Sequence, residues 1–200
     1  MKVIGLCGGS GSGKSAASEL LEKIGIPHID ADSIYRDLTS YESDCMRVLK
    51  SEFGDAVMNE DGSLNRDYVR ELVFSGNDRD TKRVRLNEIT HKYVLSEIDK
   101  QIKKYKSEGR EAVIADVPLL FESGFNEKCD FTVAVVADEA VRIDRIVRRD
   151  KITKEQAKAR INAQISTDEL ISKVDFALEN NGDLDELGKT VMVLYEKMIK

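Results

Sequence analysis

The sequence has little of what marks a nucleic-acid-binding or secreted protein. Acidic residues outnumber basic ones, 37 to 31, and the formal net charge of −6 excludes nucleic acid as the main partner, because binding a phosphate backbone requires a basic face. The three cysteines, Cys7, Cys45 and Cys129, form no Cys-x-x-Cys pair and accompany no histidine cluster. We interpret them as reduced thiols in a cytoplasmic protein, with neither a disulfide framework nor a structural zinc.

Long apolar stretches are also lacking. No run approaches the roughly 20 residues that span a bilayer, and the apolar segment 3–7 is too short for the core of a signal peptide. Proline and glycine, with 2 and 13 residues, are too rare to suggest disorder. We therefore expect a protein without a membrane partner whose 200 residues build one core with an inserted subdomain or lid.

Short apolar runs alternate with helical patterns along the chain. This alternation predicts an α/β fold with a five-stranded parallel sheet flanked by helices. The expected strands are 2–7, 27–30, 112–117, 131–136 and 175–179, and the expected helices are 14–23, 33–38, 43–53, 66–74, 80–106, 139–149, 154–164 and 183–198.

The order of these elements suggests three parts. The mostly helical stretch 33–110 is longer than one crossover needs and predicts a substrate-binding insertion. The polar block 141–167 contains Thr153-x-x-Gln156, which is a capping box between two helices and suggests a hinged lid. The remaining segments, 1–32, 111–140 and 168–200, would form the core.

Residues 8–15, GGSGSGKS, fit the pattern G-x-x-x-x-G-K-[ST] between an expected strand and an expected helix. Such a loop binds phosphate through main-chain N–H groups and the helix dipole. Lys14 would reach the β- and γ-phosphates of a nucleotide, and Ser15 would bind Mg²⁺. The alternative is a flexible glycine-serine turn. A GTP switch is disfavoured because the chain has no Asn-Lys-x-Asp segment; residues 126–128 do not supply one.

Three aspartates lie at the ends of two strands that should end beside this loop. Period-two geometry would place Asp30 and Asp32 on one side, and Asp32 could take the proton of an acceptor hydroxyl. Its alternative role is that of a helix N-cap. Asp116 could hold Mg²⁺ through water or could equally bond loop backbone.

Arg142, Arg145 and Arg149 share one face of the expected helix 139–149, with Arg148 beside them. Such a stripe is usually a solvated face, but in a lid Arg145 or Arg149 could neutralise phosphoryl oxygens during transfer. His91 has no role that its pattern supports.

The chain resembles the dephospho-CoA kinase family almost from end to end. The most specific segments are Asp30-Ala31-Asp32 and the run 116–122, DVPLLFE, which accompany the phosphate loop. Further matches are 53–54, 61–66, 73–74, His91, Arg145, 149–150, Gln164 and 180–182.

This resemblance implies a P-loop NTPase fold with a helical CoA-binding region and a lid. It implies transfer of the ATP γ-phosphoryl group to the ribose 3′-hydroxyl of dephospho-CoA, with Asp32 as base, Lys14 and Mg²⁺ on the phosphates, and Arg145 and Arg149 as lid arginines. The implied ATP-binding residues are Gly9, Gly11, Ser12, Gly13, Lys14, Ser15, Ala16 and Asn180. The implied substrate-binding residues are Asp32, His91, Leu119 and Phe121.

Three positions depart from the family pattern. Ala16 replaces a hydroxyl residue and removes one side-chain bond to phosphate, Lys92 replaces the proline after the family histidine, and Asn65 replaces an acidic residue. Two rival interpretations remain, another small-molecule P-loop kinase and an ATP-responsive binding module without turnover. We expect a monomer or a weak homo-oligomer.

Overall fold

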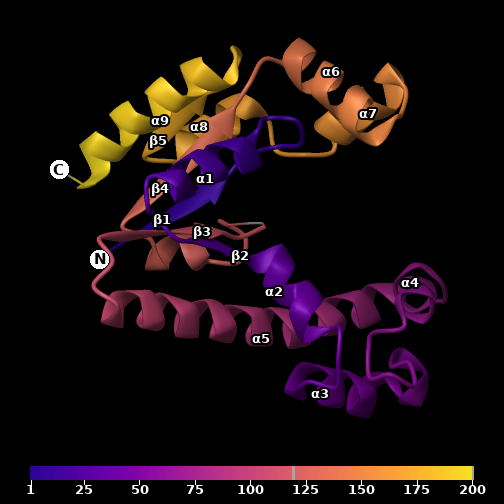
Figure 1. Ribbon diagram of the computed structural model, residues 1–200. Helices are drawn as coiled ribbons and strands as arrows, with labels where there is room; N and C mark the ends of the chain where they lie inside the picture. The colour runs from indigo at the N-terminus through magenta and orange to yellow at the C-terminus, as the bar shows by residue number, and fades with distance from the viewer. Residues whose placement is uncertain (119, 200) are drawn as a thin grey trace. The chain divides into compact units, whose positions relative to one another are not determined.

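The structure, a computed structural model, describes residues 1–118 and 120–199 (Figure 1). It divides into two compact units, residues 1–29 with 104–200 and residues 30–103, and each is described by itself below. The strands are β1 (Lys2–Cys7), β2 (His28–Asp30), β3 (Ala112–Asp116), β4 (Phe131–Val136) and β5 (Phe176–Glu179). Each expected strand is confirmed to within a residue at either end.

The helices follow the predicted order with one addition. They are α1 (Lys14–Lys23), α2 (Ala31–Leu38), α3 (Asp44–Phe53), α4 (Arg66–Phe74), α5 (Arg79–Ser107), α6 (Glu139–Asp150), α7 (Lys154–Asn162), α8 (Thr167–Lys173) and α9 (Leu184–Ile199), with short 3₁₀ helices η1 (Asp55–Val57) and η2 (Phe125–Lys128). The sequence did not predict α8, because this short helix has a single buried residue, Leu170, and so carries no apolar periodicity. Ser166 caps it by accepting a hydrogen bond from the Glu169 N–H.

The strands form one sheet in the order β2-β3-β1-β4-β5. β1 pairs in parallel with β3 and β4, so that Ile4 lies opposite both Ile114 and Phe131, and β4 pairs in parallel with β5. The predicted parallel α/β sheet is confirmed. Since β1 is central, its carboxyl end delivers residues 8–15 to the middle of the sheet edge.

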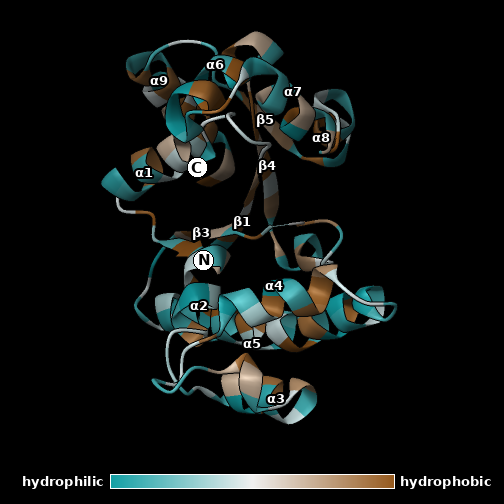
Figure 2. Cartoon of the chain, turned by 90° about the vertical axis from the view of Figure 1, so that its right-hand side faces the viewer, coloured by the Kyte–Doolittle hydropathy of each residue, from teal (hydrophilic) through white to brown (hydrophobic). Residues whose placement is uncertain are grey.

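Both faces of the sheet are covered by apolar side chains. On one face, Leu6 of β1 and Val135 of β4 belong to a cluster with Leu21 of α1 and Val191 of α9. On the other, Val136 of β4 packs in a cluster with residues of α8 and the segment before it. Figure 2 shows mainly hydrophobic colours along β3 and β4, as expected for parallel strands buried on both faces.

Helices α6 and α7 share a small core of their own. Ile146 of α6 packs with Ala157 and Ile161 of α7. The predicted capping box is confirmed, because the Gln156 N–H bonds Thr153 Oγ1 at 3.3 Å and the Thr153 N–H bonds Gln156 Oε1 at 2.9 Å. The turn between the helices is therefore defined by hydrogen bonds.

The unit of residues 30–103 has a separate core. Met46 and Leu49 of α3 belong to one cluster with Val69 of α4 and Ile89 of α5. The structure corrects the predicted start of the first helix here. α2 begins at Ala31, and its N-cap is Asp30, whose carboxylate accepts a hydrogen bond of 2.9 Å from the Asp32 N–H.

That start changes the geometry expected for the two aspartates. Asp32 is not the N-cap but lies in the first turn of the helix, and the strand ends at Asp30. The period of two that would have aligned the two carboxylates therefore does not extend to Asp32. The sequence pattern did not indicate this helix start, because Asp30 is both the last residue of the strand and the N-cap of the helix.

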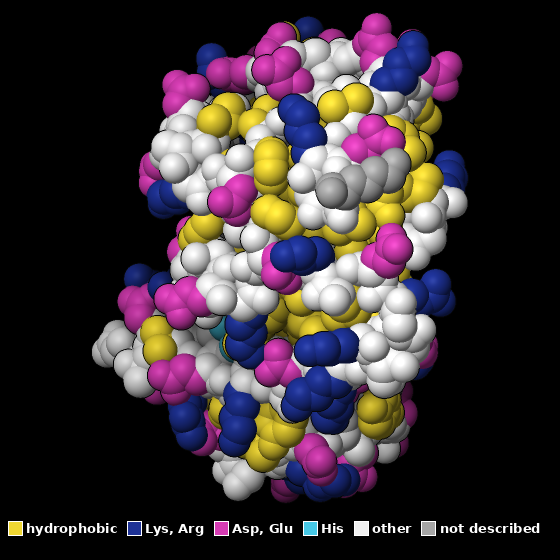
Figure 3. Space-filling view, turned by 90° about the vertical axis from the view of Figure 1, so that its left-hand side faces the viewer, with side chains coloured by type: hydrophobic (Ala, Val, Ile, Leu, Met, Phe, Trp, Pro, Cys, Tyr) yellow, Lys and Arg dark blue, Asp and Glu magenta, His cyan; other side chains and the backbone are white. Residues whose placement is uncertain are grey.

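Within the described part of the chain, no helix is both long and apolar enough to cross a membrane. On the face drawn in Figure 3, acidic and basic side chains are interspersed and neither sign dominates.

Candidate nucleotide-binding site

Residues 8–15 form the turn between β1 and α1, and Gly13 is the N-cap of α1. Gly13 has φ of 91° and no side chain that could cap the helix. The first N–H groups of a helix have no partner within it. Those of Lys14, Ser15 and Ala16 are consequently available to an anion, and the helix dipole favours negative charge at the same place.

The glycines of the loop also allow close packing from outside. A Cβ built on Gly11, which has φ of 78°, would lie 2.6 Å from the Arg142 carbonyl oxygen of α6. A Cβ on Gly13 would collide with the side-chain amide of Asn180. The loop is thus held between α6 and the segment that follows β5, and side chains at these two positions would push it out of place.

Lys14 lies at the carboxyl ends of the central strands. Its Nζ forms an ion pair and hydrogen bond with a carboxylate oxygen of Asp116, the last residue of β3. Nε2 of His28 on β2 is 3.9 Å from the other carboxylate oxygen. The structure therefore brings together the predicted phosphate-binding lysine and the predicted metal-binding aspartate, and it adds a histidine to which the sequence gave no role.

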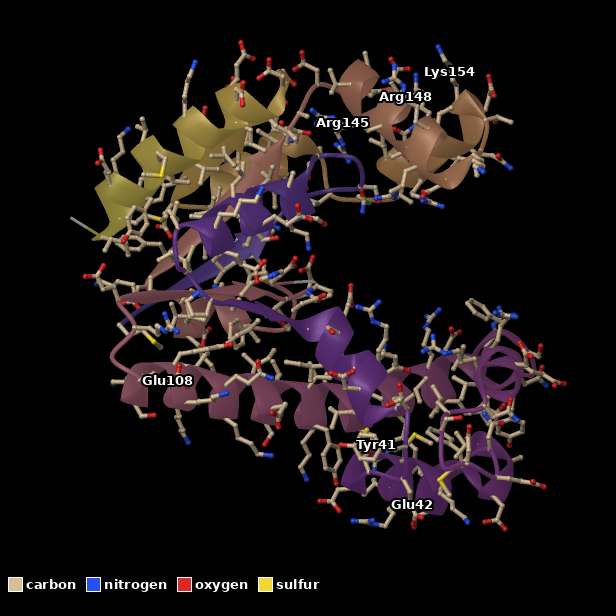
Figure 4. All side chains as sticks on the ribbon, viewed as in Figure 1. Tyr41, Glu42, Glu108, Arg145, Arg148 and Lys154 are labelled. Carbon is tan, nitrogen blue, oxygen red and sulfur yellow. The ribbon has the colours of Figure 1, made fainter. Side chains whose placement is uncertain are left out.

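Arg145 connects α6 to the phosphate loop and to the segment that follows β5. Nη1 donates to the carbonyl oxygens of Asn180 at 2.9 Å and Ser12 at 3.3 Å, and Nη2 donates to Asn180 Oδ1 at 3.3 Å. Asn180 is buried, and its Nδ2 donates to the Ser12 carbonyl at 2.7 Å. Figure 4 shows Arg145 on the side of α6 that faces the loop, whereas Arg148 lies on the outer side.

A cavity of about 660 Å³ adjoins this network. Gly13, Ala16, Arg145 and Asn180 line it together with Gly182 and residues 183–185 at the start of α9. It opens beside the first turn of α1 and combines apolar surface with arginine and amide groups. This combination is typical of sites for small organic ligands.

The sequence gave no role to Arg142 and named Gln164 only as a matching position. Arg142 is 6% exposed, and its guanidinium bonds the Ser10 carbonyl and the Gln164 side chain. A signal was present, because Arg142 precedes Ile146 by four residues and so occupies the buried face of an amphipathic helix. An arginine at such a position must have polar partners in the fold.

Arg149 lies away from the loop. It is exposed and forms an ion pair with its neighbour Asp150, 2.7 Å from Nε to Oδ1, and Asp150 also pairs with Arg160 of α7. Of the two predicted lid arginines, the structure brings only Arg145 to the phosphate loop.

The predicted acceptor-site residues lie on different elements. Asp32 is exposed in the first turn of α2, and His91 is exposed on α5. Phe121 is half-buried and packs against the cluster of Val136 and Leu170. Leu119 lies outside the described residues.

Oxygen ligands that suit Mg²⁺ are present at the loop. Ser15 is exposed in the first turn of α1, and the Asp116 carboxylate lies beside Lys14. Within residues 1–118 and 120–199, no group of three or more His, Cys, Asp or Glu side chains could hold a metal ion by itself. This donor set fits Mg²⁺, which usually binds through one or two protein oxygens together with water and substrate phosphates.

The parallel sheet, the phosphate loop leading into α1 and the paired Lys14 and Asp116 define a P-loop kinase. Comparison with known proteins narrows this class. The family model for dephospho-CoA kinase matches residues 2–186, and the chain belongs to this family.

Individual relatives support the same assignment. The dephospho-CoA kinase of Listeria innocua is 35% identical over 99% of this chain and 98% of its own, and that of Staphylococcus saprophyticus is 40% identical over 93% and 88%. The crystal structure of TT1252 from Thermus thermophilus has a TM-score of 0.80 and 27% identity, and the match covers 100% of this chain and 98% of that one.

Proposed function

We propose that this chain transfers the γ-phosphoryl group of ATP to the ribose 3′-hydroxyl of dephospho-CoA, giving CoA and ADP. The observation that carries the proposal is the uncapped start of α1 beside Lys14 in a member of the dephospho-CoA kinase family. Main-chain N–H groups at this position bind polyphosphate whatever the acceptor. The family assignment supplies the acceptor.

ATP would bind with its phosphates along residues 9–15 and its nucleoside in the cavity lined by Ala16 and Asn180. Lys14 would exchange its Asp116 partner for the β- and γ-phosphates, which carry more charge than one carboxylate. Arg145 lines the same cavity and would contact the nucleotide from α6. Arg149 would act only after leaving Asp150.

Asp32 would accept the proton of the acceptor hydroxyl as the new oxygen–phosphorus bond forms and the bond to ADP breaks. Its exposed carboxylate directly after the carboxyl end of β2 supports this role. His91, Leu119 and Phe121 would contribute to binding the acceptor. When bound, Mg²⁺ at Ser15 and Asp116 would neutralise charge on the phosphate oxygens.

We also propose a cytoplasmic location and a monomer or weak homo-oligomer. Burial raises the pKa of the Cys7 thiol to about 11 and that of Cys129 to about 12, so these groups remain protonated at neutral pH. All three cysteines are free. Unpaired thiols of this kind suit a reducing compartment.

The proposal is tested by incubating the full chain with Mg-ATP and dephospho-CoA and following CoA and ADP by mass spectrometry. We expect equimolar CoA and ADP, with the added phosphate on the 3′ position. Faster turnover of a nucleoside, nucleotide or sugar acceptor would indicate another P-loop kinase. Tight ATP binding without turnover of any acceptor would indicate a binding module.

A further inference from the structure

Arg142 and Gln164 bind the two main-chain polar groups of one residue of the phosphate loop, Ser10. Arg142 Nε donates to the Ser10 carbonyl oxygen at 2.9 Å, and Gln164 Oε1 accepts from the Ser10 N–H at 2.9 Å. A third hydrogen bond of 3.2 Å, from Arg142 Nη2 to Gln164 Oε1, joins the two side chains. Both main-chain polar groups of Ser10 are therefore bonded by side chains far away in the sequence.

The two side chains leave no room for a side chain at the neighbouring residue, Gly9. A Cβ on Gly9 would collide with Arg142 Nη2 and would lie 3.1 Å from Gln164 Oε1. Arginine's planar fork allows the guanidinium to bond Ser10 and Gln164 simultaneously. Lysine has the same charge but cannot reproduce this geometry.

The charge of Arg142 is also unusual for a buried group. Arg142 is 6% exposed, and burial lowers the pKa of its guanidinium. Among the described residues no carboxylate forms an ion pair with it; its acceptors are Ser10, Gln164 and, at 3.5 Å, the Thr167 hydroxyl, all of them neutral. The Glu139 carboxylate on the same helix favours the charged guanidinium but does not outweigh the effect of burial on its pKa. A buried cation without a directly bonded anionic partner is costly. A polyphosphate bound to the adjacent loop would reduce that cost.

We propose that Arg142 and Gln164 are positioning residues for ATP, because they fix the two peptide groups on either side of Ser10 and thereby set the shape of the phosphate-binding loop before the nucleotide arrives. Neither side chain needs to touch the phosphates. Because the loop is already ordered before ATP binds, less conformational entropy is lost on binding, and the affinity for ATP is higher. The inference rests on the proposed function only in taking ATP as the ligand.

The test measures binding of Mg-ATP and Mg-ADP to the full chain by calorimetry, and separately the KM values for both substrates. R142K keeps the charge and R142Q removes it, and we expect each to weaken Mg-ATP binding about tenfold, equivalent to about 1.4 kcal/mol. The KM for dephospho-CoA should stay within twofold. R148Q, on the exposed side of the same helix, removes the same charge and is the matched control.

A spectroscopic measurement separates positioning from general destabilisation. In Q164A, the Ser10 amide resonance should shift from its wild-type position, and hydrogen exchange of this amide should be at least tenfold faster than in the wild type. The amides of the central strand β1 should remain protected. This variant keeps Arg142 and serves if the arginine variants fail to fold. The Mg-ATP affinity of Q164A should fall as well.

Two results would overturn the inference while leaving the proposed function intact. One is a wild-type Mg-ATP affinity in R142K. The other is equal weakening of Mg-ATP and dephospho-CoA binding in R142Q, which would indicate a purely structural role. If the wild-type chain itself failed to bind Mg-ATP, the proposed function would fail first.

Discussion

The side-chain amide of Asn180 donates a hydrogen bond of 2.7 Å to the carbonyl oxygen of Ser12, which lies 168 residues earlier in the chain. The Asn180 oxygen atoms accept in turn from Arg145. One buried residue thus connects the phosphate loop, α6 and the segment after β5. Fixing three segments at one point pre-organises the nucleotide site.

Replacing Asn180 tests this connection. N180A removes the 2.7 Å hydrogen bond to the Ser12 carbonyl and the side-chain acceptor of Arg145 Nη2, leaving the Ser12 carbonyl with only the longer bond from Arg145. We expect a loss of about 1–3 kcal/mol in unfolding free energy and a higher KM for ATP. N180D supplies an acceptor for Arg145 but no donor for Ser12, so it should also raise the KM. Thermal unfolding and initial rates check both variants. N162A, at the exposed end of α7, is the control, and wild-type kinetics in N180D would refute the donor role.

The D32N substitution tests the proposed base. It retains the size of the side chain but cannot take a proton, so kcat should fall by about 10²–10⁴ while nucleotide affinity is kept. Steady-state rates and calorimetry with Mg-ATP measure the two quantities. D37N removes an exposed carboxylate from the same helix and should leave kcat unchanged. A D32N variant with more than a third of wild-type kcat would rule out general-base catalysis by Asp32.

A pair of glycine substitutions separates backbone strain from loop packing. Gly13 and Gly25 have nearly the same φ, 91° and 92°, but only at Gly13 does an added Cβ meet another group, the Asn180 amide. G25A should cost about 1–2 kcal/mol of stability from the left-handed conformation, with an unchanged KM for ATP. G13A should carry that cost and also abolish measurable ATP binding. Equal ATP affinities in the two variants would contradict the packing described for the loop.

The stability of the α6–α7 helix pair should depend on pH because of Asp150. Hydrogen bonds from Arg149 and then Arg160 lower the pKa of Asp150 from 3.8 to about 2. Because the pKa is lower in the folded state, the ionised carboxylate stabilises the fold at pH values above the unfolded-state pKa. This contribution is lost as the pH falls from about 4 through about 2. D150N should therefore reduce Tm slightly at pH 7, by roughly 1–3 °C, because exposed pairs contribute little.

The pH series provides the check. The difference in Tm between wild type and D150N should shrink as the pH is lowered from 5 towards 3. D144N changes an exposed carboxylate on the same helix and is the reference for a general charge effect. A difference that stays constant over this range would exclude Asp150 as its source.

Local patterns determined a large part of this molecule. The strand ranges followed from apolar runs, and the phosphate loop followed from the spacing of Gly8, Gly13 and Lys14 between a strand and a helix. The capping box of Thr153 and Gln156 was also evident, because all of its hydrogen bonds lie within four consecutive residues. Such features depend on neighbours in sequence, whose relative positions the local backbone conformation fixes.

Only the tertiary structure decided which side chains meet. Arg142, Arg145 and Arg149 look equivalent as a stripe on one helix, yet the first bonds Ser10, the second bonds Asn180 and the third pairs with Asp150. The partners lie on segments that the sheet topology brings to α6 from distant parts of the chain. Helical periodicity specifies the direction of a side chain from its own axis, but the packing of other elements decides what that side chain contacts.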